Sequence, residues 1–286
     1  MNLEDIKARL KSLEKGANKS KKWKPKDEHT VRLLPLQNEV VDDLAFYVKW
    51  HYGVNSGVQI ACPKTWDMQC PFCDFADKLK SFKDEHGQNK TKTAKDLDWQ
   101  LYKKIECGTR FYAPIVVRKF NSEKKQTGEV DGPFLWEMSE KSYTKLLLIC
   151  SKDDLNEDHP EGGALKILTS LKYGHDLTVS LKKAGQGDNK TSYDLTEIDF
   201  RLKKTALLSD SDVVNNLLQT KMSIEDITKV VSTEDMNKVF EAWKNSMQDV
   251  STDSSSKEYN ADGETVGYGD ATVSEIQSKL ESLMTK

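Results

Sequence analysis

Three closely spaced cysteines constrain this chain more than any other feature of its sequence. Cys62 is followed by Cys70 and Cys73, and the last two form a Cys-Pro-Phe-Cys turn. Such a turn is typical of a zinc knuckle, in which two thiolates point at one metal ion. Structural zinc sites bind four ligands in a tetrahedron, so one more ligand is expected nearby. The pattern predicts a small subdomain at about residues 46–86, stabilised by one structural zinc ion.

The fourth ligand has three candidates, which are His51, His86 and Cys107. We prefer His51, because its strand-like segment, the following loop and the knuckle can close around one ion without crossing a helix predicted at 74–86. No H-x-E or H-E-x-x-H pattern accompanies the cysteines, which favours a structural over a catalytic ion. The alternative is a set of small buried cysteines with a hydrogen-bonded histidine. Neither Cys107 nor Cys150 receives a definite role.

The polarity of the chain excludes membrane-spanning and secreted proteins. Mean hydropathy is −0.67, and no segment approaches the roughly 18 to 20 apolar residues that span a bilayer. The N-terminus lacks the apolar run of a signal peptide. Five cysteines in a chain of 286 residues do not suggest a disulfide framework. We therefore expect a cytoplasmic protein without a membrane partner.

Short apolar runs of strand character dominate residues 27–204, which we expect to form the core domain. A run at 146–150 is helix or strand, which periodicity does not decide. Several short strands with one metal loop and few helices predict an α+β fold, mainly β, built on a small Greek-key barrel or sandwich. The strands are predicted at 31–35, 44–52, 110–120, 134–138, 175–182 and 191–202.

The remaining segments have helical or linker character. Helical periodicity predicts an N-terminal helix at 2–15 and three helices between 210 and 247, the second of them capped by Ser223 and Asp226. Domain boundaries are expected as a basic arm at 1–26, a helical segment at 205–248, a flexible linker at 249–271 and an amphipathic C-terminal helix at 272–286. A short helix beyond a linker is typical of a docking peptide, although it can also fold back on its own domain.

Charge is distributed unevenly along the chain. Residues 1–26 hold 9 basic and 3 acidic residues, whereas residues from 205 onward hold 15 acidic residues and 7 lysines. A basic arm, a mildly basic core and an acidic tail suggest a protein that binds a polyanion. Ordinary scatter of charge is an equally weighted alternative.

No motif for nucleotide or hydrolase chemistry is present, but aromatic residues alternate with basic ones. The sequence lacks a phosphate-binding loop, a dinucleotide fingerprint and a nucleophile elbow. Unpaired bases stack on exposed aromatic rings while Lys and Arg contact phosphates. Neighbours in a strand point to opposite faces, so one of Phe111 and Tyr112 is expected in the core. The interleaved segments are Tyr102-Lys103-Lys104, Arg110-Phe111-Tyr112, Arg118-Lys119-Phe120, Trp136, Tyr143 and Lys190 with Tyr193.

These residues, taken in order, resemble the gene-32-type single-stranded DNA-binding proteins of T-even-like tailed bacteriophages. The resemblance covers roughly residues 20–200. Its most specific part is the ordered metal set, and further matches are Trp23-Lys24, 31–35, 110–117, 134–136 and Tyr193-Asp194.

The resemblance implies an OB-fold with an embedded zinc subdomain, and no enzymatic activity. It implies a protein in the cytoplasm of the infected bacterial host that coats unpaired DNA during replication, recombination and repair. Its expected partners are single-stranded DNA, neighbouring copies of itself, and replication and recombination proteins bound through the C-terminal region. The expected zinc ligands are His51, Cys62, Cys70 and Cys73; the expected DNA contacts are Arg32, Tyr102, Lys103, Lys104, Arg110, Phe111, Tyr112, Arg118, Trp136, Lys183, Lys190 and Tyr193; cooperativity is expected from Lys19, Lys21 and Lys22.

Two other function classes remain. In the first, the chain is a zinc-stabilised adaptor of a replication or transcription complex, whose helices at 210–247 and at the C-terminus bind proteins. In the second, it is a metal-dependent nucleic-acid enzyme. Four protein ligands would leave the metal no open position, which argues against the second class.

Overall fold

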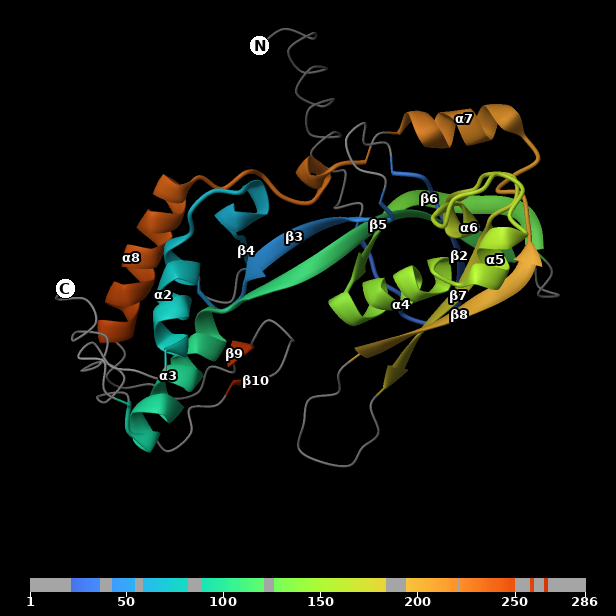
Figure 1. The fold of residues 1–286 in the computed structure, drawn as a ribbon. Helices are drawn as coiled ribbons and strands as arrows, with labels where there is room; N and C mark the ends of the chain where they lie inside the picture. The colour runs from blue at the N-terminus through green and yellow to red at the C-terminus, as the bar shows by residue number, and fades with distance from the viewer. Residues whose placement is uncertain are drawn as a thin grey trace, which may run out of the picture. The chain divides into compact units, whose positions relative to one another are not determined.

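A computed structural model shows a mixed α+β protein, which confirms the predicted fold class (Figure 1). The chain divides into two compact units, and each is considered by itself. Unit 1 comprises Met1–Phe46, Phe111–Lys182 and Thr196–Thr228, and unit 2 comprises Tyr47–Arg110, Lys183–Leu195 and Lys229–Lys286. The structure describes residues 22–36, 43–54, 59–81, 89–120, 126–183, 194–220, 222–249, 258–259 and 265–266.

Five long strands form the sheet of unit 1. They lie side by side in the order β6 (Gln126–Met138), β5 (Cys107–Phe120), β2 (His29–Leu33), β7 (His175–Lys183) and β8 (Asp194–Lys204). Along the chain, the five strands follow one another as β2, β5, β6, β7 and β8. This Greek-key order, with helices between β6 and β7, agrees with the expected OB-fold.

The first of these strands, β2, is buried on both faces. It pairs antiparallel with β5 on one side and with β7 on the other, so that Val31 lies opposite both Val117 and Leu177. Val31 and Leu33 belong to the apolar core, and the alternate residue Arg32 is also fully buried. A central strand with two covered faces therefore carries a charged side chain into the interior.

Helix α4 (Glu140–Cys150) resolves the ambiguity of the run at 146–150 in favour of a helix. Ser139 caps it, because its side chain accepts a hydrogen bond from the Ser142 backbone N–H at 3.3 Å. Leu146 and Ile149 pack into the core of unit 1. Two short helices, α5 (Asp153–Glu157) and α6 (Lys166–Thr169), follow before β7.

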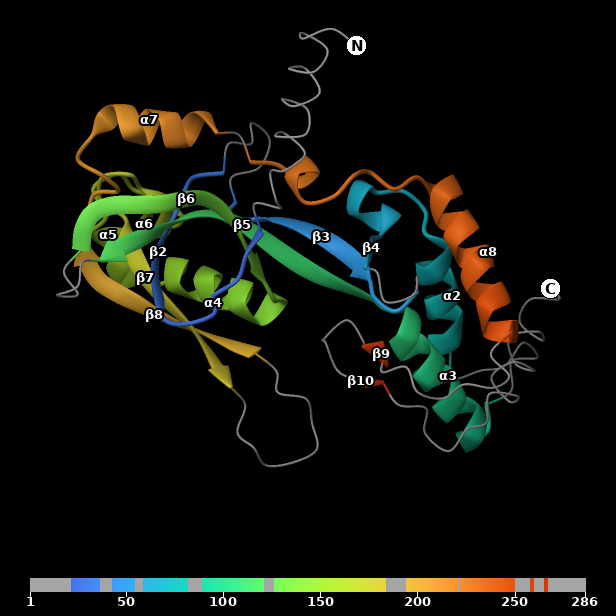
Figure 2. The same ribbon diagram turned by 180° about the vertical axis from the view of Figure 1, so that it is seen from behind.

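Three helices cover the metal region of unit 2, and they lie together in both ribbon views (Figures 1 and 2). They are accompanied by the antiparallel strands β3 (Phe46–His51) and β4 (Ile60–Ala61) and by the 3-10 helix η1 (Pro63–Trp66). The predicted helix at 74–86 begins earlier than expected, at Pro71. No helix was predicted from the sequence at the position of α3 (Lys92–Ile105). The three helices are α2 (Pro71–Lys80), α3 (Lys92–Ile105) and α8 (Thr233–Asp249).

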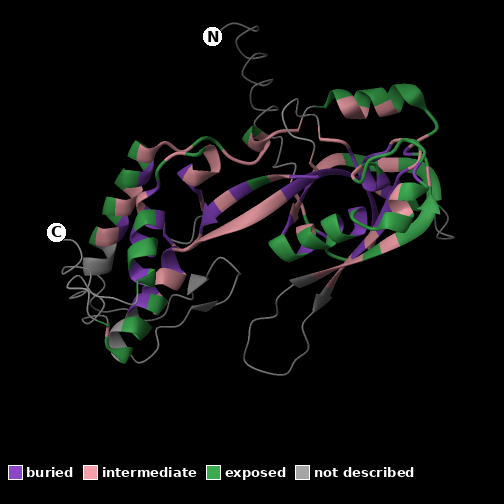
Figure 3. Ribbon diagram, viewed as in Figure 1, coloured by how far each residue is buried: buried purple, intermediate pink, exposed green. Residues whose placement is uncertain are grey.

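The three helices predicted between 210 and 247 are only partly confirmed. The first is α7 (Ser211–Gln219), which has no fully buried residue, as its colouring in Figure 3 shows. The second prediction was wrong in length, because Ser223 and Asp226 form the capping box of a single 3-10 turn, η2 (Ile224–Asp226). The third is α8 of unit 2.

The ends of the chain contribute three short strands. β1 (Lys22–Trp23) pairs in parallel with β6. β9 (Glu258–Tyr259) and β10 (Thr265–Val266) form an antiparallel pair within the predicted linker. The helices predicted at 2–15 and 272–286 lie outside the described residues. Within the described ranges, no helix combines the length and apolar character needed to cross a bilayer.

Candidate metal centre and nucleic-acid interface

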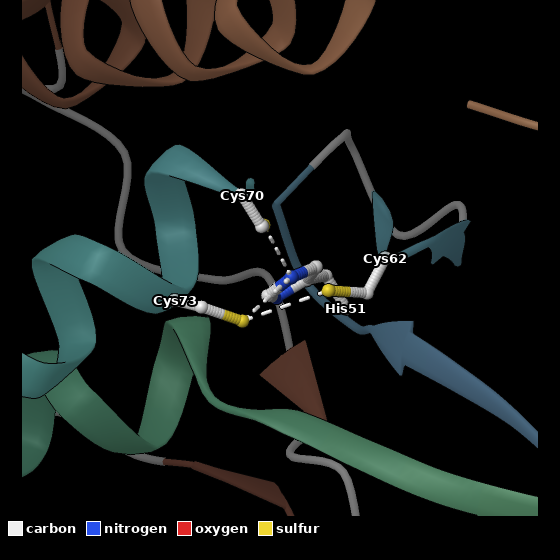
Figure 4. A group of neighbouring side chains, drawn as sticks. All are labelled: His51, Cys62, Cys70 and Cys73. Atoms are coloured by element: carbon white, nitrogen blue, oxygen red, sulfur yellow. Dashed lines mark hydrogen bonds between the residues drawn. The ribbon is translucent and has the colours of Figure 1, made fainter. Parts of the chain in front are cut away.

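Four buried side chains meet in unit 2, and they are the four ligands predicted from the sequence (Figure 4). His51 is the last residue of β3, and Cys62 immediately precedes η1. Cys70 is the N-cap of α2, and Cys73 lies in its first turn. Pro71 begins the helix, a position where proline's missing N–H removes no hydrogen bond. The knuckle is therefore a helix start that presents two thiols on one side.

The distances among these side chains fit a tetrahedral metal site. The ligand atoms all lie within 4.8 Å of one another. His51 Nε2 is 3.2 Å from Cys70 Sγ and 3.7 Å from Cys73 Sγ, and Cys62 Sγ is 3.5 Å from Cys73 Sγ. Ligands bound at about 2.0–2.3 Å in a tetrahedron are separated by roughly 3.5–3.8 Å. The group could therefore hold a metal ion with little rearrangement.

Neighbouring groups orient the candidate ligands. His51 Nδ1 lies 2.8 Å from the Ile105 carbonyl oxygen, to which it donates a hydrogen bond when Nε2 faces the thiols. Hydrogen bonds from the Cys62 and Cys73 thiols lower the pKa of the Cys70 thiol, whereas hydrogen bonds with neighbouring cysteines raise the pKa of Cys62 and of Cys73, so that the group favours a thiolate at Cys70 first. Phe72 is fully buried beside the His51 ring, 5.3 Å between centroids, and limits access of water.

The structure places one of the three candidates for the fourth ligand in the group. The structure brings His51 into the group, whereas His86 lies outside the described residues. Cys107 lies next to the group rather than in it, with its Sγ 3.8 Å from Cys73 Sγ. The sequence offered Cys107 as a candidate ligand, and the start of β5 brings its thiol beside Cys73, which lies 34 residues earlier in the chain.

Two arginines predicted to contact DNA are buried in unit 1 around one carboxylate. Arg32 Nε lies 2.9 Å from Asp176 Oδ1, and Arg118 Nη2 lies 3.1 Å from the same oxygen. Arg32 also donates to the Ser170 and Thr205 carbonyl oxygens. These contacts occupy both guanidinium groups, which in this structure hold strands together rather than face solvent.

The aromatic residues of unit 1 divide between core and surface. Tyr112 and Trp136 are fully buried, and Tyr112 stacks on Phe46 with 5.7 Å between ring centroids. Phe111 is half-buried and stacks on Tyr143 with the rings 4.1 Å apart and nearly parallel. The alternation along β5 thus places one of the two adjacent aromatics in the core, as expected, and it is Tyr112.

The predicted contacts in unit 2 gather on α3 and the start of β5. Tyr102, Lys103 and Arg110 are half-buried, whereas Lys104 is buried. The Arg110 guanidinium lies 5.7 Å from the centre of the Tyr52 ring.

The last predicted residues lie at or beyond the edge of the described chain. Lys22, in β1, is half-buried with its Nζ 5.8 Å from the Tyr112 ring. Burial lowers the pKa of Lys22. Lys183 ends β7. The predictions for Lys19, Lys21, Lys190 and Tyr193 fall outside the described residues.

Comparison with known protein families gives a match over most of the chain. The family model described as gp32 DNA binding protein like matches residues 26–250. A search of curated protein sequences gives no match to this chain.

Proposed function

Because the chain belongs to the gp32-like family of DNA-binding proteins, we propose that it coats single-stranded DNA with little sequence preference. The observation that carries this proposal is the family match, which spans both the sheet of unit 1 and the metal group of unit 2. The biological setting we propose is DNA replication, recombination and repair of a bacteriophage, in the cytoplasm of its host. The protein acts there by binding and not by catalysis.

The proposed DNA contacts are the side chains that retain exposed surface. Tyr102 and Phe111 offer aromatic rings, and Lys103 and Arg110 offer positive charge. Stacking of a base on an aromatic ring contributes about 1–3 kcal/mol and needs no particular base. Lys183, Lys190 and Tyr193, which were expected as DNA contacts from the sequence, are also part of the proposed contact set.

The buried members of the predicted set take a supporting role in this proposal. Arg32 and Arg118 pair with Asp176, and Tyr112 and Trp136 fill the interior. Lys104 is likewise buried. We propose that these residues fix the strands that carry the exposed contacts.

The metal proposed for the His51 group is one structural zinc ion. One imidazole and three thiols are a common zinc set, and softer sulfur ligands disfavour magnesium or calcium. Such an ion would link β3, the η1 turn and the start of α2, and bound zinc would supply part of the folding free energy of unit 2.

Self-association and partner binding complete the proposal. Lys19, Lys21 and Lys22 of the basic arm would contact neighbouring copies on DNA. The C-terminal region, which is acidic overall, would bind replication and recombination proteins. The sequence supports both roles through its uneven charge.

Titration with a deoxythymidine homopolymer tests the proposed function. Tryptophan fluorescence would be followed at two salt concentrations, with duplex DNA of equal length as the control. We expect quenching, weak duplex binding and an affinity for the homopolymer that falls as salt rises. The salt dependence is expected because Lys and Arg side chains of the protein release counterions from the phosphates when they bind, and added salt opposes that release. Equal affinity for duplex, or no binding by metal-loaded protein, would instead favour the adaptor function.

A further inference from the structure

One tryptophan stands apart from the other five in its exposure. Trp99, on α3, keeps 56% of its surface exposed, whereas Trp50, Trp136 and Trp243 are buried and the remaining two are half-buried. Single exposed apolar side chains are common on protein surfaces, whereas one that belongs to a contiguous patch marks a surface used for binding. The surroundings of Trp99 therefore decide whether it is such a site.

Trp99 is one half of an aromatic pair on the helix surface. Tyr102 follows it by three residues, a spacing that places both side chains on the same side of a helix. Their ring centroids are 5.4 Å apart, with 29° between the ring planes. The rings are held against each other, so little side-chain freedom would be lost when a flat ligand stacks on them.

Lysines border the aromatic pair from two helices. Lys103 Nζ lies 5.0 Å from the centre of the Trp99 ring and is held by a 2.8 Å hydrogen bond to Glu106. Lys80, which is exposed on α2, places its Nζ 4.7 Å from the centre of the Tyr102 ring. Two ammonium groups beside two stacked rings complement a ligand that has both aromatic and anionic parts.

We propose that Trp99 and Tyr102 form a stacking surface for unpaired bases, with Lys80 and Lys103 contacting the adjacent phosphates. This inference rests on the proposed function, and it adds Trp99 and Lys80 to the DNA contacts expected from the sequence. Single-stranded DNA is the favoured occupant because the surface is both aromatic and cationic. Bases stacked inside a duplex offer no free face to such a pair.

The test compares two oligomers that differ only in their bases. Dye-labelled oligodeoxythymidine and an abasic oligomer of the same length would be titrated with full-length protein, followed by anisotropy. Trp99→Ala is expected to weaken binding to oligodeoxythymidine at least about fivefold, while leaving affinity for the abasic oligomer unchanged. Trp99→Phe, which keeps a ring, should lose less. Lys80→Ala should weaken binding to both oligomers.

Leu148→Ala is the matched control, because Leu148 is an apolar side chain on α4 that is 60% exposed. It should change neither affinity. If wild-type protein binds oligodeoxythymidine and Trp99→Ala binds it equally well, the stacking surface is wrong while the proposed function stands. An equal loss for both oligomers also overturns stacking. Failure of wild-type protein to bind either oligomer would instead contradict the proposed function itself.

Discussion

Asp176 shows how one buried carboxylate can determine the role of distant side chains. It is 2% exposed and accepts hydrogen bonds from Arg32, Arg118 and the Thr205 hydroxyl. Arg118 belongs to one of the aromatic-basic segments that suggested a DNA-binding surface, and Arg32 was expected there from the family resemblance. Their shared partner is far away in sequence, so the local pattern could not reveal that both guanidinium groups pair with one buried carboxylate.

Replacing Asp176 should therefore destabilise the protein strongly. Asp176→Asn leaves two buried guanidinium groups without a counter-charge, and loss of a buried partner costs roughly 3–5 kcal/mol. Urea unfolding would measure the change. Asp235→Asn is the matched control, because its pair with Lys238 at 3.1 Å is exposed to solvent, which screens the interaction, and contributes little to stability. Similar losses for the two variants would contradict the structural role of Asp176.

At the scale of elements, α2 connects the metal ligands with the packing of unit 2. Its first turn carries Cys73, and Phe72 beside it packs edge-on against Phe240 and Trp243 of α8, with centroids 4.9 Å and 5.5 Å apart. The same turn thus supplies both metal ligands and core contacts. Loss of the metal should therefore destabilise not only the ligand residues but also the packing of α8 against α2.

Metal removal should consequently loosen α2 and α8 more than α4. We expect chelation, or Cys73→Ser, to lower the melting temperature and to speed amide hydrogen exchange in α2 and α8. Cys150→Ser is the matched control, because Cys150 is a buried cysteine of α4 in unit 1. Unchanged exchange in α2 after verified metal loss would show that the site does not stabilise unit 2.

At the scale of the whole molecule, the sequence predicted most of the long strands, although it placed β6 (Gln126–Met138) only at 134–138, and it named the four residues that the structure brings together as the metal group. It missed α3, although Leu101 and Ile105 repeat at a helical spacing and are buried. Tyr102, Lys103 and Lys104 lie between these two residues, so the helical period of this segment is mixed with an alternation of aromatic and basic residues. Burial of Tyr112 and Trp136 was not predictable, because alternation assigns residues to faces but does not say what covers each face.

The acidic C-terminal region allows a prediction for the complete chain. Residues 249–286 hold 8 acidic residues and 3 lysines, so a truncation after Val250 removes negative charge. DNA affinity should stay the same or rise, because less negative charge then repels the phosphates. Anisotropy titration would measure it. A full-length variant with the tail carboxylates changed to amides should behave like the truncation, and a clear loss of affinity in either would contradict this prediction.

The spacing of the metal ligands along the chain has a consequence for the order of folding. His51 and Cys73 are 22 residues apart, whereas Arg32 and Asp176 are 144 residues apart. Closing a short loop costs less conformational entropy and is faster than bringing distant segments together. During synthesis the four ligands emerge from the ribosome long before β7 does. The metal group can therefore assemble first, while the sheet of unit 1 must wait for the second half of the chain.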